Sequence, residues 1–151
     1  MKFEYKTGDL LAVPSGHIVH GCNAQGAMGA GVALAIRNKW PDVFRLYADT
    51  HRTNGLHLGD VLPVGVSPKL VVWNAITQEF FGPPGQRYLS YDAVADCFLK
   101  ISEGIQQYGD VEQHLHIPTI GAGLAGGDWA SISAIIRSVV KCPVTVWVLQ
   151  Q

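Results

Sequence analysis

The chain has 151 residues, 48% of them hydrophobic, and this size and composition suit one folded domain over residues 1–151 rather than a disordered segment. Its formal net charge is −1 with only 11 lysines and arginines, which argues against an extended nucleic-acid surface. No apolar run approaches the ~20 residues needed to span a bilayer, and the stretch "MKFEYKTGDL" lacks the apolar core of a signal peptide. We therefore expect a cytoplasmic, monomeric protein without a membrane partner.

The first half of the sequence combines short strands with amphipathic helices. Residues 2–6 alternate in polarity, which predicts a strand. A second, apolar strand over residues 18–22 runs into the glycine-rich stretch "NAQGAMGAG" at residues 23–31. Helices are predicted from Gly31, where the apolar spacing becomes helical, and from Pro41, because proline is favoured at the first helical position.

Strands and helices also follow one another in the second half. Strands are predicted at residues 59–66 and 69–76, and a long loop follows them because Gly82-Pro83-Pro84-Gly85 interrupts regular structure. The clearest helix begins after Ser90, a favourable N-cap residue, and Gly109 is a suitable terminator.

The last elements are a strand at residues 114–118, a glycine-rich loop, a helix capped by Asp128 and an apolar strand at 143–149 that we expect to be buried on both faces. The order of elements predicts an α/β fold, a three-layer α/β/α domain around a mixed, largely parallel sheet. In such folds ligands bind beyond the carboxyl ends of the strands. Both glycine loops follow a strand and precede a helix, so we expect them at the same edge.

Two glycine-rich loops carry the strongest functional signal. The first spans Gln25 to Gly31 and the second Gly121 to Gly127. Neither matches a dinucleotide-binding fingerprint or a P-loop, and each alone is a weak signal. Two such loops in equivalent positions favour a pyrophosphate held by backbone amides and helix N-termini.

Three polar residues near these loops each allow two interpretations. Asp9 follows the first strand and is typical of a turn or cap, although it could also accept a hydrogen bond from an exocyclic amine such as that of adenine. Asn23 ends the second strand, and its amide suits a pair of sugar hydroxyls. His20 lies three residues earlier, where a histidine is more often a core residue than a catalyst.

Metal and cysteine chemistry receive little support from the sequence. Cys22, Cys97 and Cys142 are far apart and odd in number, which predicts buried thiols, Cys97 and Cys142 above all, rather than a disulfide or zinc site. His114 and His116 share one face of a strand, but the sequence offers no third ligand beside them, so we predict no metal and no cofactor. No covalent-nucleophile motif is present.

Six segments in this order are together highly specific for a known family: "GDL" (8–10), "HGCNAQGAMGAGVALAI" (20–36), "WPDVFRLY" (40–47), "GDVLPV" (59–64), "NAITQ" (74–78) and "IPTIGAGLAGGDW" (117–129). The chain resembles a macro domain, the ADP-ribose-binding α/β/α fold, over nearly its whole length. It is most similar to the stand-alone branch of ADP-ribose-1''-phosphate phosphatases.

The resemblance implies roles by position. Asp9 would hold the adenine amine, Asn23 would contact the distal ribose, and the two glycine loops would enclose the diphosphate. The substrate-binding residues implied in this way are Asp9, Leu10, Asn23, Gly29, Ala30, Gly31, Val32, Thr119, Gly121, Ala122, Gly123, Leu124, Ala125 and Gly126. In the phosphatase branch, His20 is the candidate for catalysis together with Asn23.

Three positions depart from the family pattern. De-ADP-ribosylating relatives use a lysine where this chain has Gln78, and the glycohydrolase branch uses an aspartate where Ala125 stands. A covalent lysine mechanism is therefore not expected. Ala30 replaces the usual middle glycine of the first loop, a change that should keep the turn.

The resemblance therefore implies a phosphatase that hydrolyses ADP-ribose 1''-phosphate to ADP-ribose and phosphate, so the expected partner is ADP-ribose or its 1''-phosphate. His20 would act as general acid or base, while positioning and amide electrostatics supply much of the rate. Thr119 and residues around Glu79 are candidates for a second catalytic group. The alternatives are an ADP-ribosyl hydrolase acting on protein or DNA and a non-catalytic ADP-ribose-binding module.

Overall fold

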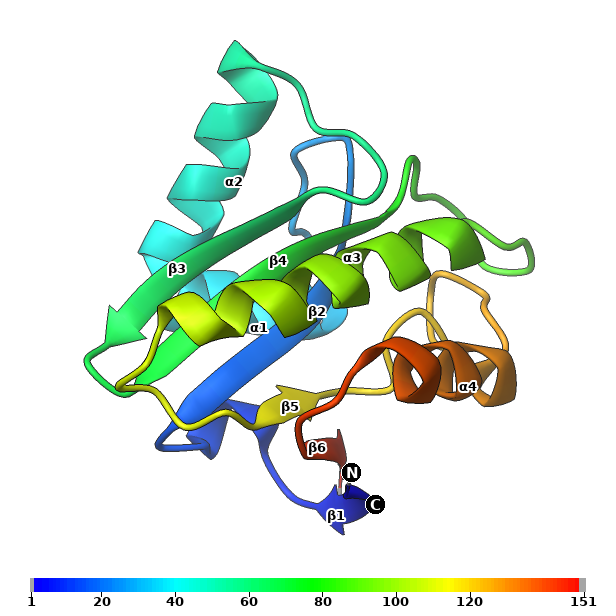
Figure 1. Cartoon of the computed structure of the whole chain (residues 1–151). Coiled ribbons are helices and arrows are strands. Elements are labelled where there is room, and N and C mark those ends of the chain that lie inside the picture. Colours follow the sequence, from blue (N-terminus) through cyan, green and yellow to red (C-terminus); the bar gives the residue numbers. More distant parts are fainter. Residues whose placement is uncertain (1, 150–151) are drawn as a thin grey trace.

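The structure, a computed structural model, describes residues 2–149 and is built on one six-stranded sheet. The strands are β1 (Phe3–Thr7), β2 (Gly16–Asn23), β3 (Val61–Ser67), β4 (Leu70–Gln78), β5 (Leu115–Ile117) and β6 (Val144–Val148). Their order in the sheet is β1-β6-β5-β2-β4-β3 (Figure 1). Only the β3–β4 pair is antiparallel among the described strands, which confirms the predicted mixed, largely parallel sheet.

Helices cover both faces of this sheet. They are α1 (Gly31–Lys39), α2 (Pro41–Thr53), α3 (Tyr91–Gly104) and α4 (Trp129–Val139), with two short 3₁₀ turns, η1 (Leu10–Ala12) and η2 (Ile105–Gln107). Val19 of β2 packs in the core under α3 and α4, and its neighbour Ile18 packs under α1 and α2. The predicted three-layer α/β/α architecture is therefore confirmed. Within residues 2–149 no helix is long and apolar enough to cross a bilayer.

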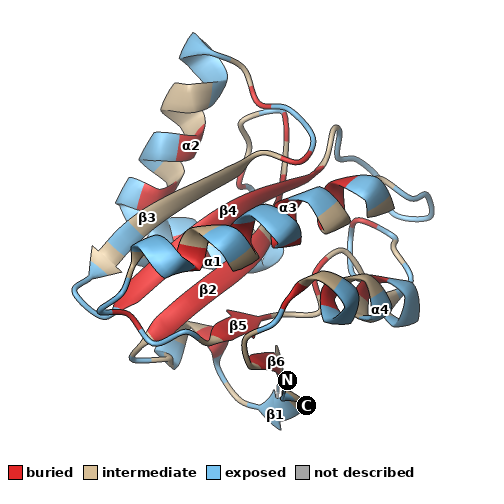
Figure 2. Ribbon diagram, viewed as in Figure 1, coloured by how far each residue is buried: buried red, intermediate tan, exposed pale blue. Residues whose placement is uncertain are grey.

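The central strands β2 and β4 are buried on both sides, as the red ribbon in Figure 2 shows. Successive side chains of a strand point to opposite faces. On β2, the even-numbered Ile18 and Cys22 pack on the α1/α2 side, in two adjoining parts of the core. His20 lies between them in the strand and therefore faces the same side.

The starts of the helices follow the sequence closely. Ser90 Oγ accepts a hydrogen bond from the Ala93 amide (3.2 Å) at the start of α3, as predicted. The carboxylate of Asp128 likewise accepts one from the Ser131 amide (3.1 Å) at the start of α4. Helix α2 begins at Pro41, which has no amide hydrogen to satisfy. The N-terminus of α1, by contrast, has no side-chain cap.

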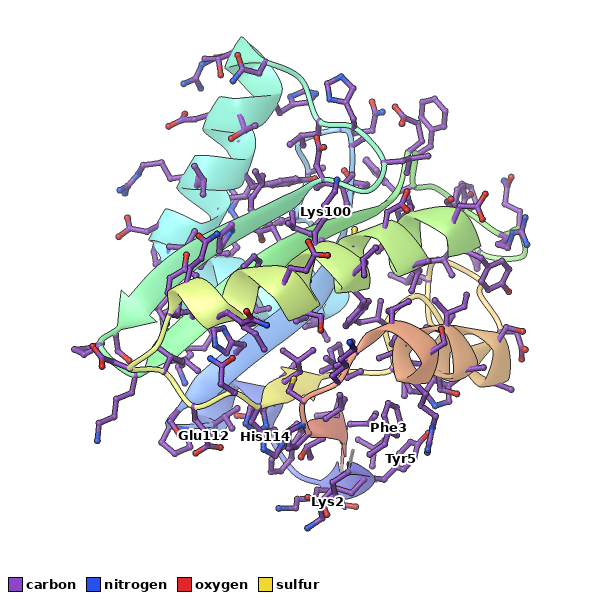
Figure 3. All side chains as sticks on the ribbon, viewed as in Figure 1. Lys2, Phe3, Tyr5, Lys100, Glu112 and His114 are labelled. Carbon is purple, nitrogen blue, oxygen red and sulfur yellow. The ribbon has the colours of Figure 1, made fainter. Side chains whose placement is uncertain are left out.

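The end of α3 and the burial of β6 differ from the expectations, and β2 is longer than expected, from Gly16 to Asn23. Helix α3 ends at Gly104 rather than near Gly109, and the chain continues as the tighter turn η2. Gly104 itself lies against Trp73, where a Cβ would be 2.8 Å from the indole. One turn earlier, Lys100 of α3 (Figure 3) donates to the carbonyl of Gly59 before β3 (2.8 Å). The end of β6 is only half-buried, since Trp147 and Val148 pass the edge of the core.

Candidate functional site

Three loops meet at the carboxyl edge of the parallel strands, at the same end of the sheet in Figure 1. They follow β2, β4 and β5. The amide of Ala24 donates to the carbonyl of Gln78 (2.9 Å), and the amide of Tyr88 donates to the carbonyl of Ala125 (2.8 Å). The structure therefore brings both glycine loops to one edge, with the β4–α3 loop between them as a shared support.

Loop 1, defined as residues 23–31, is organised by the side chain of Asn23. Its Nδ2 donates to the carbonyl of Ala27 (2.8 Å), and its Oδ1 accepts from the amide of Gln25 (2.9 Å). The hydroxyl of the buried Tyr47 donates to the same Oδ1 (2.9 Å) and to the Asn23 carbonyl (2.5 Å). Burial raises the pKa of Tyr47, which keeps this donor protonated. Asn23 thus holds the shape of loop 1 from below.

The outer part of loop 1 is open. No heavy atom lies within 4 Å of the positions that a Cβ would take on Gly29 or Gly31, counting the residues that the structure describes. Gly31 has a φ of +60°, a conformation that favours glycine, and it begins α1 without a side-chain cap. The first amides of an uncapped helix point outward and carry a partial positive charge. This part of loop 1 is suited to an anion.

Loop 2, defined as residues 118–128, is folded on itself. The amide of Gly127 donates to the carbonyl of Gly121 (2.6 Å). Gly126 has a φ of +74°, and a Cβ there would collide with the carbonyl oxygen of Gln86. Within residues 2–149, the amides of Gly123, Leu124 and Ala125 have no hydrogen-bond acceptor. Such successive free amides in a glycine loop form an anion-binding concavity.

His20 lies in the core and not in either loop. Its side chain is 1% exposed, and its Nε2 donates to Oδ1 of Asn74 across the β2–β4 pair (2.6 Å). The Nδ2 of Asn74 in turn donates to the carbonyl of Val43 in α2 (3.3 Å). Burial lowers the pKa of His20 to about 4, so the ring is neutral at pH 7. This position does not support the expectation that His20 is the general acid or base, because the ring is buried and its Nε2 is bonded to Asn74.

The cysteines have no role at this edge. All three are free. Cys22 is buried near His20, with its Sγ 3.6 Å from the ring Nε2, and burial raises the pKa of its thiol. Cys97 is also buried, as expected, whereas Cys142 is only half-buried because it lies in the turn before β6. Buried, protonated thiols are structural rather than nucleophilic.

Asp9 and Leu10 lie at the end of β1. Asp9 Oδ1 accepts a hydrogen bond from the amide of Leu11 (2.9 Å) and so caps η1, which is the structural role foreseen for it. Its carboxylate remains exposed and free to accept a second bond. The side chain of Leu10 is buried against Ile36 of α1, so only its backbone faces outward.

The remaining predicted residues differ in how far they are buried. Ala30, Val32, Gly123, Leu124 and Gly126 are exposed, while Thr119, Gly121 and Ala122 are half-buried and Ala125 is buried under the β4–α3 loop. Gln78, which replaces the lysine of some relatives, turns its side chain into its own loop and donates to the carbonyl of Phe80 (2.8 Å).

Sequence reasoning missed His51. This exposed histidine lies near the end of α2, and a Cβ on Gly26 would be 2.7 Å from its Nδ1, so the imidazole packs directly on loop 1. One signal was available: His51 is four residues after Tyr47, and residues at this spacing share a helix face.

Two exposed phenylalanines also lie in the loop between β4 and α3. Phe80 and Phe81 are 60% and 57% exposed in the β4–α3 loop. Their loop is fixed to loop 1, because the side-chain amide of Gln25 donates to the carbonyl of Glu79 (3.1 Å). They form an aromatic rim beside the candidate site.

The fold and this edge define an α/β/α domain with two glycine loops beyond the carboxyl ends of its strands. Residues 19–136 match the model of the Macro domain family. The chain belongs to the macro domain family.

Three known proteins illustrate the relationship. The chain is 26% identical to an ADP-ribose 1''-phosphate phosphatase of Candida albicans, over 97% of this chain and 99% of that protein. It is 24% identical to a DNA ADP-ribosyl glycohydrolase of Thermus aquaticus, over 95% of this chain but only 39% of that protein. The solved structure of a macrodomain protein from Streptomyces coelicolor is 30% identical and superposes with a TM-score of 0.80, covering 97% of this chain and 99% of that one. Both enzyme names describe hydrolases acting on ADP-ribose derivatives.

Proposed function

We propose that this protein is a phosphatase that hydrolyses ADP-ribose 1''-phosphate to ADP-ribose and phosphate. The observation that carries the proposal is the pair of loops with outward-facing amides at one sheet edge, which suits a diphosphate and a further phosphate group. The end-to-end similarity to the Candida albicans phosphatase supports the same substrate.

In the proposed complex the diphosphate lies between the uncapped start of α1 and the free amides of loop 2. The exposed carboxylate of Asp9 accepts a hydrogen bond from the adenine amine. The distal ribose then lies over loop 1, whose shape Asn23 and Tyr47 maintain. Here Asn23 acts as a positioning residue.

In the proposed reaction, water attacks the phosphorus of the 1''-phosphate and the bond from phosphorus to the ribose oxygen breaks. The attacking water loses a proton, and the leaving oxygen gains one to give ADP-ribose. Backbone amides stabilise the charge on the phosphoryl oxygens in place of a metal or a lysine. Because His20 is buried, we assign the proton transfer to His51, the exposed imidazole against loop 1.

The test measures phosphate release from ADP-ribose 1''-phosphate by the wild type and two variants. His51→Ala should lower kcat about 10²-fold or more while the affinity for ADP-ribose stays the same. The matched control is His57→Ala, which removes another exposed histidine close by in the chain, one paired with Asp60 rather than placed against loop 1. Equal activity of His51→Ala and the wild type would remove His51 from the mechanism, and no turnover by the wild type would refute the phosphatase.

The aromatic rim favours one second candidate, an ADP-ribosyl hydrolase acting on DNA. Exposed aromatic side chains such as Phe80 and Phe81 stack on nucleobases. Gln78 at the lysine position counts against this activity. Incubation with ADP-ribosylated DNA and protein distinguishes the candidates: release of ADP-ribose identifies the hydrolase, and tight ADP-ribose binding without turnover of any substrate identifies a binding module.

A further inference from the structure

A hollow of about 440 Å³ lies on the face of the sheet that carries α1 and α2, over a part of that face that these two helices do not cover. Strands β1, β5 and β6 form its floor, and the chain just after η1 forms one wall. Glu112 and His114, which line it, precede β5 at the amino end of that strand (Figure 3). This places them at the opposite end of the parallel strands from loops 1 and 2.

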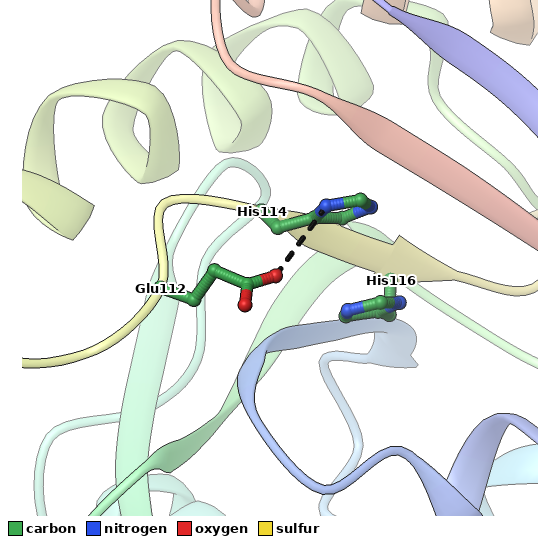
Figure 4. Close-up of side chains that lie close together, drawn as sticks. All are labelled: Glu112, His114 and His116. Carbon is green, nitrogen blue, oxygen red and sulfur yellow. Dashed lines mark ion pairs between the residues drawn. The ribbon is translucent and has the colours of Figure 1, made fainter.

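Three potential metal ligands converge in this hollow. The rings of His114 and His116 are stacked, with centroids 4.4 Å apart and planes 7° from parallel. A carboxylate oxygen of Glu112 lies 3.6 Å from Nδ1 of His114 (Figure 4). One ligand atom from each of the three residues lies within 4.8 Å of the other two. The sequence alone did not reveal this third group, because Glu112 precedes the strand and its approach depends on the turn that follows it.

We propose that Glu112, His114 and His116 form a binding site for a first-row divalent metal ion such as Zn²⁺. Two imidazole nitrogens and one carboxylate oxygen are a ligand set found in zinc proteins, with a fourth position left to water. Bonds to zinc of about 2.0–2.2 Å require the three side chains to draw closer, and the two stacked rings must rotate out of parallel so that a nitrogen of each points at the ion. Glu112 is exposed and its side chain is free to make this movement.

The surroundings of His114 suit coordination through Nδ1. Its Nε2 lies 2.7 Å from the hydroxyl of Thr145 on β6 and can donate to it, which leaves the Nδ1 lone pair facing Glu112. Metal-bound histidines are commonly oriented by such a hydrogen bond from the other ring nitrogen.

His116 has a competing partner. The indole Nε1 of Trp147 donates to its Nδ1 (3.0 Å), so the proton of the neutral ring lies on Nε2. Coordination through Nε2 moves this proton to Nδ1, and the indole must then turn away. Trp147 is half-buried, so this movement needs no opening of the core. Gly16 leaves room at the ring, since a Cβ there would be 3.2 Å from Nε2. Trp147 therefore opposes metal binding, and a change in its fluorescence should accompany the binding.

The charges around the hollow are nearly balanced. Lys6 lines it and would repel a cation. However, Lys6 and Lys2 both pair with Glu4, at 3.8 and 3.5 Å. Glu112 and Asp9, which also lines the hollow, therefore supply the negative charge near the ion, and of the two only Glu112 belongs to the proposed ligand set.

The experiment titrates the metal-free full chain with ZnCl₂ and follows tryptophan fluorescence together with isothermal calorimetry. We expect one ion per chain and a change in fluorescence on binding. His114→Ala and Glu112→Gln should each weaken binding about tenfold or more. Trp147→Phe should tighten binding and abolish the fluorescence change, because it removes the competing donor. His57→Ala is the matched control, with its exposed imidazole beside Asp60, and should bind as the wild type does.

Several outcomes would overturn the site. Zinc binding that survives in both His114→Ala and Glu112→Gln, no binding by the wild type, or weaker binding by Trp147→Phe each contradict it. Circular dichroism of each variant checks the fold, and Glu112→Gln changes an exposed side chain that the core does not need. ADP-ribose affinity should be unchanged in Glu112→Gln, whose side chain lies at the other end of the strands from loops 1 and 2, so this variant separates the metal site from the proposed phosphatase.

Discussion

Loops 1 and 2 are both rich in glycine, yet their glycines meet different surroundings. Beside Gly29 and Gly31 of loop 1 there is open space. In loop 2, a Cβ on Gly121 would lie 2.5 Å from the side chain of Leu89, and one on Gly126 would strike the backbone at Gln86. The first pair leaves room for a ligand, whereas the second pair lets two loops of the protein pack together. Two loops of similar composition therefore use these glycines differently, loop 1 to leave space for a ligand and loop 2 to allow close packing.

This difference predicts unequal responses to the same substitution. Alanine at the crowded glycines of loop 2, Gly121 and Gly126, should damage the fold, and alanine in the open part of loop 1 should damage binding instead. The strand that carries loop 1 into the site offers a third case, since His20 belongs to the core only a few residues away from the loop. Four predictions follow from these contrasts.

The largest effect is expected for Gly126→Ala. A methyl group would collide with the carbonyl of Gln86, and the positive φ is unfavourable for alanine. The free energy of unfolding, measured by urea denaturation, should fall by about 3 kcal/mol or more. Gly123→Ala is the control within the same loop, because its Cβ would meet open space, and it should change stability by less than about 0.5 kcal/mol. Equal losses for both variants would contradict a supporting role specific to Gly126.

His20→Ala should cost about 2–3 kcal/mol of stability, because it leaves a cavity and an unpaired Asn74 oxygen in the core. The folded fraction should keep its affinity for ADP-ribose and its kcat for phosphate release. Thermal denaturation and activity measured below the melting temperature separate the two effects. A stable but inactive variant would instead restore His20 as a catalytic residue.

The free energy of unfolding should decrease as the pH falls from 6.5 to about 4. Burial lowers the pKa of both His17 and His20 from 6.5 to about 4, so the unfolded chain binds more protons than the folded chain in this range. Each extra proton gives a slope of up to about 1.4 kcal/mol per pH unit. The stability from these rings is complete above pH 6.5. Urea denaturation at several pH values tests this, and His20→Gln should flatten the profile.

Gly29→Ala should have the smallest effect on stability, within about 0.5 kcal/mol, because its Cβ would meet open space. In the proposed complex it should nevertheless weaken ADP-ribose binding measured by calorimetry, since the methyl group would stand where the ligand approaches. Gly123→Ala tests the same idea on loop 2. Unchanged affinity in Gly29→Ala would place the diphosphate elsewhere.

The sequence predicted the elements well because their signals are local. The helical spacing after Ser90 and the cap at Asp128 depend on neighbours within one turn, and the structure confirms both. Gly104 shows where local signals end: it lies against Trp73 on a distant strand, where a Cβ would be 2.8 Å from the indole, and no local pattern predicts this contact.

The site was predictable in part. Periodicity shows that β2 is apolar on both faces, but it does not show that α2 covers the even-numbered side and buries His20. The positions of His51 beside Gly26 and of Glu112 beside His114 likewise arise from tertiary packing. The glycine loops were visible from composition, whereas the side chains next to them were not.

The pairing of β1 has a consequence for how the chain folds. Among the described strands β1 pairs only with β6, with Phe3 opposite Val144, and these two strands lie side by side in Figure 1. During synthesis the first strand therefore emerges long before its only neighbour. Contacts between such distant segments form late because loop closure is costly. We expect β1 to join the sheet last. The rest of the sheet can then assemble around β2 and β4 before β1 pairs with β6.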